Sequence, residues 1–237
     1  MASSTATPHE EEAMFVVNEP PPQIDTEMVA LLRQAEPATI GHFRHVGFMD
    51  PGLRSLLSGH RIAGTAVTVR CFGPDTTMVH YALGRLRTGD VLVIDRAGDT
   101  RHAACGGGVA FAARAAGCVG IIIDGMATDI DELREYGLPV WARGLSTVTG
   151  KRLFLHGEFG TPISCGGVSV EPGDAILADE NGVLVMEPHE IKAAAERAIG
   201  MQQAEKLSLA RIAKGETLPD INGTNARIAE ILAAQKG

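Results

Sequence analysis

The amino-acid sequence predicts an α/β fold built on a mainly parallel sheet, with further helices toward both ends of the chain. Short, nearly continuous apolar segments alternate with segments of helical spacing between residues 61 and 144. Such alternation is typical of parallel strands that are joined by helices and covered on both faces. With 237 residues, 28 glycines and 45% hydrophobic residues, the chain is long enough to bury a sizeable core in one large domain.

The N-terminal part of the sequence divides into an arm and two helices. Residues 1–23 are polar, acidic and proline-rich, and we expect them to form a flexible arm. Apolar residues at helical spacing follow Asp25, which predicts a capped helix over residues 25–35. A second helix is expected over residues 38–47, before a turn at residues 49–52.

The predicted domain extends over residues 24–189, and its centre alternates strands with helices. Strands are expected over residues 61–72, 91–95, 119–124 and 139–144. Helices are expected over residues 76–86, 107–117 and 129–137.

The character of the sequence changes from about residue 162, where closely spaced strands are joined by glycine-rich turns. These strands are expected over residues 163–170, 172–179 and 182–187, with a hairpin signal at residues 179–182. Residues 190–237 are predicted to form a C-terminal helical extension, with helices over residues 190–215 and 224–235.

Composition and charge exclude several classes of partner. The net charge of -8 and the pI near 5.5 argue against a nucleic-acid backbone, which requires a basic patch. No apolar stretch approaches the roughly 20 residues of a membrane helix, and the N-terminus lacks the pattern of a signal peptide. The four cysteines lie far apart without C-x-x-C spacing, so we expect buried thiols in a reducing, cytoplasmic setting.

The first candidate for chemistry is the glycine run that opens the helix over residues 107–117. Gly106, Gly107 and Gly108 follow a polar loop after the strand that ends at Asp95. Consecutive glycines let a ligand approach the backbone, and the unpaired N–H groups of a helix start favour an anion. Alternatively, the glycines only permit close contact between the helix and the sheet.

The second candidate lies at the next strand end, where Asp129 begins the following helix. Because ligands gather beyond the carboxyl ends of strands in open α/β sheets, both candidates should lie at one edge of the sheet. Asp129 has the hard oxygen ligands that a divalent cation prefers. The spacing of Asp129 and Glu132 is also that of a helix cap, and Thr128 with Asp131 offers a similar cap.

Together these segments resemble the RraA-like family over residues 40–188. The matching stretches are residues 47–57, 61–71, 89–108, 117–144 and 164–186. The resemblance implies an α/β/β/α layered fold like that of the swivelling phosphohistidine domain. It also implies homotrimers, or dimers of trimers, with sites in the clefts between subunits.

The resemblance also implies an activity and a site. Aldolases of this family cleave 4-hydroxy-4-methyl-2-oxoglutarate or 4-carboxy-4-hydroxy-2-oxoadipate to pyruvate and a second keto acid, and many decarboxylate oxaloacetate. Their signature is an acidic residue, twenty intervening residues and then Arg-Asp. The Asp helps to hold Mg²⁺ or Mn²⁺, the Arg binds the keto-acid oxygens, and amides at the glycine-rich helix start bind the pyruvyl carboxylate.

This sequence departs from the signature at two of its three positions. The metal-binding Asp corresponds to Asp129, the Arg position is Thr128, and the first acidic position is Gly107. The amide cradle corresponds to Gly106, Gly107, Gly108 and Val109. Thr supplies no positive charge to a reacting oxyanion, so we expect altered or reduced aldolase activity.

Other groups are candidates for supporting roles near the same strand ends. Arg96, Arg101 and Arg143 are candidates for a compensating cation, although each is also read as a surface residue. We give Arg101 a catalytic role together with Thr128 and Asp129. His102 beside the glycines could act as an acid or base, or lie as an ordinary exposed loop residue.

Three functions therefore remain open at this point. The first is a metal-dependent carbon–carbon lyase that acts on a small keto acid. The second is a non-catalytic regulator, like the RraA proteins that bind a ribonuclease. The third is a small-carboxylate binding protein without turnover. Asp129 favours the lyase and Thr128 favours the regulator, while the fold alone cannot choose among the three functions.

Overall fold

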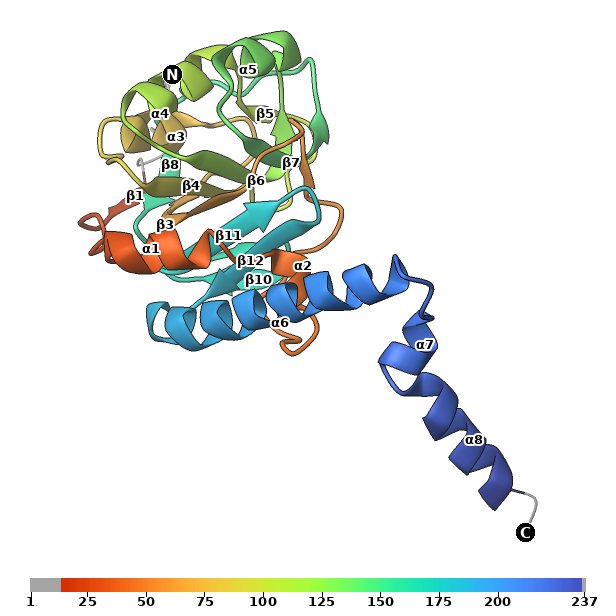
Figure 1. The fold of residues 1–237 in the computed structure, drawn as a ribbon. Helices are drawn as coiled ribbons and strands as arrows, with labels where there is room; N and C mark the ends of the chain where they lie inside the picture. The colour runs from red at the N-terminus through yellow and green to blue at the C-terminus, as the bar shows by residue number, and fades with distance from the viewer. Residues whose placement is uncertain (1–13, 236–237) are drawn as a thin grey trace, which may run out of the picture.

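The computed structural model describes residues 14–235 and confirms the mixed α/β class, with four layers in the order helix, sheet, sheet, helix (Figure 1). The first sheet has the strand order β1-β8-β3-β4-β6-β7-β2. Its central strands are mutually parallel, namely β3 (Ile62–Arg70), β4 (Asp90–Asp95), β6 (Gly120–Ala127) and β7 (Val140–Leu145). The flanking strands are β1 (Met14–Val17), β8 (His156–Phe159) and β2 (Arg54–Ser55), and β5 (Ala103–Cys105) pairs with the end of β6.

The second sheet layer branches from β3. Strand β11 (Ala175–Asp179) pairs antiparallel with the first half of β3, and the predicted hairpin connects it to β12 (Gly182–Met186). Strands β9 (Ile163–Cys165) and β10 (Val168–Val170) form a separate antiparallel pair. Their buried residues pack in the same apolar cluster as those of β11 and β12, between the two sheet layers.

Helices cover the outer face of each sheet layer (Figure 1). One face carries α3 (Thr77–Leu83), α4 (Gly107–Ala115) and α5 (Ile130–Tyr136). The other carries α1 (Thr26–Leu32), α2 (Pro37–Ile40) and the first half of α6 (Ile191–Ile212). The short α7 (Leu218–Ile221) and α8 (Thr224–Ala234) follow and project away from the layers, with no buried residue in either.

Alternation along the buried strands explains why they appear in the sequence as continuous apolar runs. In β4, Leu92 and Ile94 face the core under α3, α4 and α5, whereas Val91 and Val93 face the core between the sheets. Successive side chains of a strand point to opposite faces, and here both faces are buried. Burial on both faces anchors β4 and β6 in the core, and the candidate site lies at their carboxyl ends.

Two N-terminal predictions differ from the structure. The helix expected over residues 38–47 is confined to α2, because a turn follows at residues 41–43 and Gly47 has a φ of 85°, after which Phe48 bridges to Leu184. Of the arm predicted over residues 1–23, residues 14–17 form strand β1, which pairs in parallel with β8. Residues 1–13 lie outside the described part of the chain.

A buried carboxylate secures the segment before β8. The carboxylate of Asp75 accepts hydrogen bonds from Thr77 and from the backbone N–H groups of Leu153 (3.2 Å) and Leu155 (3.0 Å). Burial alone would raise the pKa of Asp75, but these hydrogen bonds outweigh burial and lower the pKa to about 2. The charged form of Asp75 therefore stabilises the fold.

The first half of α6 is part of the core. Ile191, Ala194, Ala195 and Ala198 are buried in the cluster that α6 shares with α1, α2, β11 and β12. Further along, the side-chain amide of Gln202 accepts from the N–H of Glu36 (3.1 Å) and donates to the carbonyl of Gln34 (3.1 Å). Across residues 14–235, none of the helices combines the length with the apolar character that a membrane-spanning helix needs.

Candidate active site

The carboxyl ends of β4 and β6 bring the two glycine- and aspartate-bearing loops together. β4 and β6 run in parallel, with Asp95 opposite Asp124 in the register. Beyond Asp124, β6 continues alongside β5, and the N–H of Thr128 donates to the carbonyl of Cys105 over 2.9 Å. This bond places Thr128 and Asp129 beside Gly106, at the start of α4.

The carboxylate of Asp129 faces α4 rather than its own helix. Asp129 occupies the N-cap position of α5 but makes no capping hydrogen bond there, and its backbone is left-handed with φ 56° and ψ 47°. Its Oδ2 instead accepts from the N–H of Gly107 at 3.0 Å, and its Oδ1 accepts from the Thr128 hydroxyl at 3.2 Å. Neither sequence-based capping alternative is therefore formed, and a strained conformation of this kind is typical of a functional position.

The glycines at the start of α4 make room for two carboxylates. A Cβ atom on Gly106 would lie 2.3 Å from Oδ2 of Asp129, and one on Gly107 would lie 1.5 Å from Oε2 of Glu132. A Cβ atom on Gly108 would meet no atom within 4 Å. The glycines therefore allow side chains of the β6–α5 segment to approach the α4 backbone.

The backbone donors at the start of α4 are only partly in use. The first helical hydrogen bond runs from the N–H of Ala110 to the carbonyl of Gly106 at 3.0 Å. The N–H groups of the first turn have no partner inside a helix, and that of Gly107 is occupied by Asp129. The amides of Gly108 and Val109 thus remain for an anion at this helix start.

The donor set at this corner fits a hard divalent cation. Among residues 14–235, no side-chain cation pairs with Asp129 or Glu132. The same part of the chain contains no cluster of three His, Cys, Asp or Glu side chains that could enclose a metal by themselves. Mg²⁺ keeps several waters and commonly uses one or two carboxylates, so the space left by the glycines suits it.

The three candidate arginines occupy different environments. Arg143 pairs with Asp124 and, at 3.1 Å, with Asp50. The guanidinium of Arg96 is fully buried and donates to the carbonyl of Gly73. The side chain of Arg101 is exposed and makes no ion pair or hydrogen bond with the described residues. Of the three, only Arg101 is free to reorient without breaking an ion pair or uncovering a buried charge.

His102 is held by a carboxylate in the loop that leads to β5. Its Nδ1 lies 2.7 Å from Oδ2 of Asp99, and Oδ1 of Asp99 accepts from the N–H groups of Arg101 and His102. Burial would raise the pKa of Asp99, but the hydrogen bonds from this loop prevail and lower it to about 2. His102 is thus an oriented imidazole rather than an unconstrained loop residue.

Sequence reasoning missed the position of Glu132 and the partner of His102. The spacing of three residues between Asp129 and Glu132 indicates a helix cap, but it also places both side chains on one side of a helix. The same spacing separates Asp99 from His102 in a loop. Neither spacing reveals that the two groups face another element or each other.

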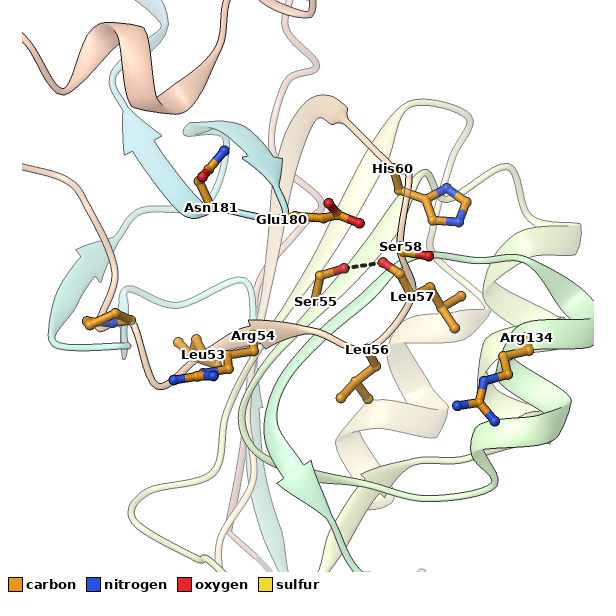
Figure 2. Close-up of a pocket in the computed structure, with 11 residues that line it drawn as sticks. Leu53, Arg54, Ser55, Leu56, Leu57, Ser58, His60, Arg134, Glu180 and Asn181 are labelled. Atoms are coloured by element: carbon orange, nitrogen blue, oxygen red, sulfur yellow. Dashed lines mark hydrogen bonds between the residues drawn. The ribbon is translucent and has the colours of Figure 1, made fainter.

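One large hollow of the described surface lies away from this site. A pocket of about 770 Å³ lies between the loop around Ser55 and His60, the hairpin at Glu180, and Arg134 of α5 (Figure 2). Two of its polar side chains are used by the loop itself, because Ser55 donates to the Leu57 carbonyl and Glu180 accepts from the Gly59 N–H. The pocket contains none of the predicted site residues.

One family model and several known proteins match this sequence. Residues 35–185 match the RraA-like family, Aldolase/RraA. A Halalkalibacterium halodurans protein named "Putative 4-hydroxy-4-methyl-2-oxoglutarate aldolase" is 34% identical over 134 residues, which are 56% of this chain and 63% of that protein. A Hahella chejuensis protein of the same name is 36% identical over 141 residues, 59% of this chain and 84% of that protein.

Solved structures extend the likeness to the fold. The crystal structure of Streptomyces coelicolor RraAS2, described as an unusual member of the RNase ES inhibitor RraA family, has a TM-score of 0.71 and 26% identity, and covers 80% of this chain and 98% of that one. The RNA-processing inhibitor RraA from Thermus thermophilis has a TM-score of 0.59 and 30% identity, and covers 65% of this chain and 93% of that one. The family match spans more than half of the sequence, and the chain belongs to the RraA-like family.

Proposed function

We propose that this chain is a divalent-metal-dependent carbon–carbon lyase that acts on a small keto acid, of the pyruvate aldolase and oxaloacetate decarboxylase type. The observation that carries the proposal is the direction of the Asp129 carboxylate, which faces the N-terminus of α4 and leaves its own helix uncapped. The names of the relatives support the same reaction class.

The residues at the start of α4 have separate roles in this proposal. Asp129 holds Mg²⁺ or Mn²⁺, while Gly106 and Gly107 provide the space for the carboxylates. The N–H groups of Gly108 and Val109 bind the carboxylate of the substrate. Bound Mg²⁺ or Mn²⁺ would polarise the keto oxygen and stabilise the negative charge that develops on the pyruvyl fragment.

The charge at this corner supports a requirement for the cation. An anionic keto acid that approaches the α4 amides also approaches Asp129 and Glu132, which no side-chain cation of residues 14–235 neutralises. Repulsion between like charges opposes that approach unless a cation lies between them. Metal binding should therefore precede or accompany substrate binding.

Thr128 sets the expected level of activity. It donates one hydrogen bond to Asp129 and supplies no charge at the position that the signature gives to Arg. Arg101 is the cation that we assign to the substrate in its place, because its exposed side chain is free to reorient. A flexible substitute is less preorganised than a fixed Arg, so we expect slow turnover.

The proposal includes assembly into a trimer or a dimer of trimers, with the site at the cleft between subunits. The apolar strand β1 supports association, because its residues are exposed at the edge of the sheet, with Met14 75% and Val16 48% exposed. Phe154 lies on the same side and is 63% exposed. Exposed apolar groups along a strand edge are typical of an interface.

A regulatory function is the second candidate, and Thr128 is the observation that favours it. In that case the chain binds a ribonuclease and catalyses no reaction, as the structural relatives described as inhibitors suggest. A small-carboxylate binding protein would use the same α4 amides without turnover.

One assay separates these functions. Oxaloacetate and a panel of 4-hydroxy-2-keto acids are incubated with the protein and Mg²⁺ or Mn²⁺, and pyruvate release is followed with lactate dehydrogenase. Metal-dependent release that is lost in Asp129→Asn supports the lyase. Absence of release from every substrate, with metal bound, contradicts it and favours the regulator or the binding protein.

A further inference from the structure

A hollow smaller than the pocket of Figure 2 lies at the opposite ends of the strands from the candidate active site. This hollow, which we call the amino-end hollow, has a volume of about 300 Å³. It is bounded by the start of β3, by the residues just before β6 and β7, and by the ends of α1, α4 and α5. Because β3, β6 and β7 are parallel, their amino ends face away from the carboxyl ends where Asp129 lies. A ligand in the amino-end hollow is therefore separate from the substrate of the proposed lyase.

The charged side chains that line the amino-end hollow are basic. They are Arg33 at the end of α1, Arg61 just before β3 and Arg114 in the last turn of α4, and His60 lines the hollow beside them. No Asp or Glu of residues 14–235 is among the lining residues. The chain as a whole has a net charge of -8, so this basic hollow differs in sign from the rest of the molecule. A cleft lined by charges of one sign attracts ligands of the opposite sign.

The guanidinium of Arg61 has donors that its neighbours do not use. Its Nη2 donates to Oε1 of Glu36 at 3.0 Å, and its other N–H groups make no hydrogen bond within residues 14–235. Its Nε is buried without a hydrogen-bond partner and lies 3.9 Å from Oδ2 of Asp179, beyond hydrogen-bond distance. A buried N–H donor without a partner costs free energy, and an anion oxygen would remove that cost.

The other basic side chains of the hollow are not neutralised by carboxylates. Arg33 and His60 form no side-chain hydrogen bond or ion pair within residues 14–235. Arg114 donates to the carbonyl of Tyr136 at the end of α5. Basic side chains at the ends of α1 and α4 also stabilise the dipoles of these helices, which accounts for each arginine by itself. It does not account for their convergence with Arg61 and His60 on one hollow.

We propose that the amino-end hollow is a binding site for a small dianion, with the chemistry that a phosphate group and a dicarboxylate share. Arg33 and Arg61 supply the charged donors, and His60 supplies a further donor. Arginine suits such a ligand because its planar guanidinium can donate two parallel hydrogen bonds to an oxyanion. The volume is at the lower limit of the range of about 300–1,000 Å³ for small-molecule sites, which favours a small anion. The proposal does not depend on the proposed function.

Titration calorimetry on the full chain at low ionic strength tests the site with two probes, inorganic phosphate and succinate. EDTA is present throughout, because without a divalent cation Asp129 and Glu132 repel anions from the α4 amides. We expect one probe or both to bind with a Kd of about 1 mM or lower. Tighter binding of phosphate identifies a phosphorylated ligand, and tighter binding of succinate identifies a dicarboxylate. If neither probe binds at about 20 mM, the proposal is wrong.

Two glutamine variants show whether the probe occupies the amino-end hollow. Arg33 and Arg54 are both exposed and form no ion pair within residues 14–235, but only Arg33 lines this hollow. We expect Arg33→Gln to weaken binding of the probe by about tenfold or more and Arg54→Gln to leave it unchanged. Equal effects of the two variants would overturn the proposal, because the probe would then respond only to the net charge of the surface.

Two further variants complete the test. Arg61→Lys keeps the charge beside Glu36 but removes the guanidinium, and we expect it to weaken binding of the probe while the melting temperature stays close to that of the wild type. Unchanged affinity in a folded Arg61→Lys variant contradicts the assigned role of Arg61. Asp129→Asn should leave the affinity for the probe unchanged. A changed affinity in Asp129→Asn would place the probe at the start of α4 and refute a separate site.

Discussion

The substitution Thr128→Arg tests most directly whether a positive charge at residue 128 raises the lyase activity of the site. The N–H of Thr128 is held by the Cys105 carbonyl at 2.9 Å, and its Cγ2 lies 2.9 Å from the point that a Cβ on Gly106 would occupy. A longer side chain at residue 128 therefore starts beside the α4 amides. A guanidinium there can pair with the carboxylate and keto oxygens of a substrate together.

The expected effects of Thr128→Arg on the rate of pyruvate formation and on stability can be given as orders of magnitude. A charged donor to a developing oxyanion is worth about 2.7–4 kcal/mol, or about 10²–10³ in rate. Part of this gain is lost, because the new guanidinium also lies near Asp129 and Glu132 and will pair with them in the absence of metal. We therefore expect pyruvate-forming activity to rise by about tenfold to a hundredfold. The lost hydrogen bond from Thr128 to Asp129 should cost about 0.5–1 kcal/mol of stability.

The assay is pyruvate release from oxaloacetate and 4-hydroxy-2-keto acids at saturating Mn²⁺. Thr128→Gln controls for a longer side chain without charge. Thr128→Lys controls for a positive charge without the planar guanidinium that can donate two parallel hydrogen bonds. The expected order of rates is Arg, then Lys, then Gln close to the wild type. A variant with Arg that folds and binds Mn²⁺ but forms no pyruvate would refute the reasoning. A Thr128→Arg variant that is no faster than the wild type would also refute it, because Arg101 would then already supply the charge. In that case Arg101→Gln should lower the rate of the wild type.

Three further predictions concern the metal, the pH dependence and the assembly. Asp129→Asn should abolish Mn²⁺ binding in calorimetry and change the unfolding free energy by less than about 1 kcal/mol, because Asn tolerates the left-handed backbone and can still accept from Gly107. The pKa of Asp75 is about 2 in the folded protein against 3.8 for the ordinary group, so the unfolded chain takes up the proton first as the pH falls. About 2 kcal/mol of stability, present above pH 4, should be lost between about pH 4 and pH 2 in urea unfolding, and Asp75→Asn should flatten this slope while lowering stability at pH 7. Light scattering should show a trimer or hexamer at micromolar concentration that Val16→Asp weakens, and a wild type that is only monomeric would remove the subunit cleft from the proposal.

Local sequence pattern was sufficient for the elements that carry the site. The apolar run of β6, the small residues of α4 and the helical spacing of α5 each predict their element without reference to the rest of the chain. Their order also predicts that the ends of β4 and β6 meet. The layered architecture followed from the resemblance to the RraA-like family, and the structure and its relatives confirm it.

Features that depend on distant partners could not be predicted in this way. Strand β1 is a short apolar segment within acidic, proline-rich sequence. Its partner β8 lies about 140 residues later, and the sequence HGEF of β8 is only a weak strand signal. The direction of Asp129 is set by its left-handed backbone, which a D-x-x-E spacing does not reveal. Glu132 faces Gly107 because α5 packs on α4, and the sequence of α5 alone predicts only a capped, exposed helix.

The way in which α6 closes the outer layer affects how the chain can fold during its synthesis. The apolar surface of β11 and β12 is covered by α1, which is made well before these strands, and by α6, which is made after them. The side chain of Gln202 also forms hydrogen bonds with the backbone of Gln34 and Glu36, more than 160 residues earlier. The outer layer therefore cannot close on the ribosome until α6 has emerged, and long-range closure of this kind is slow. The apolar faces of α1 and α2, which are made early, consequently stay without this cover until β11, β12 and α6 have emerged.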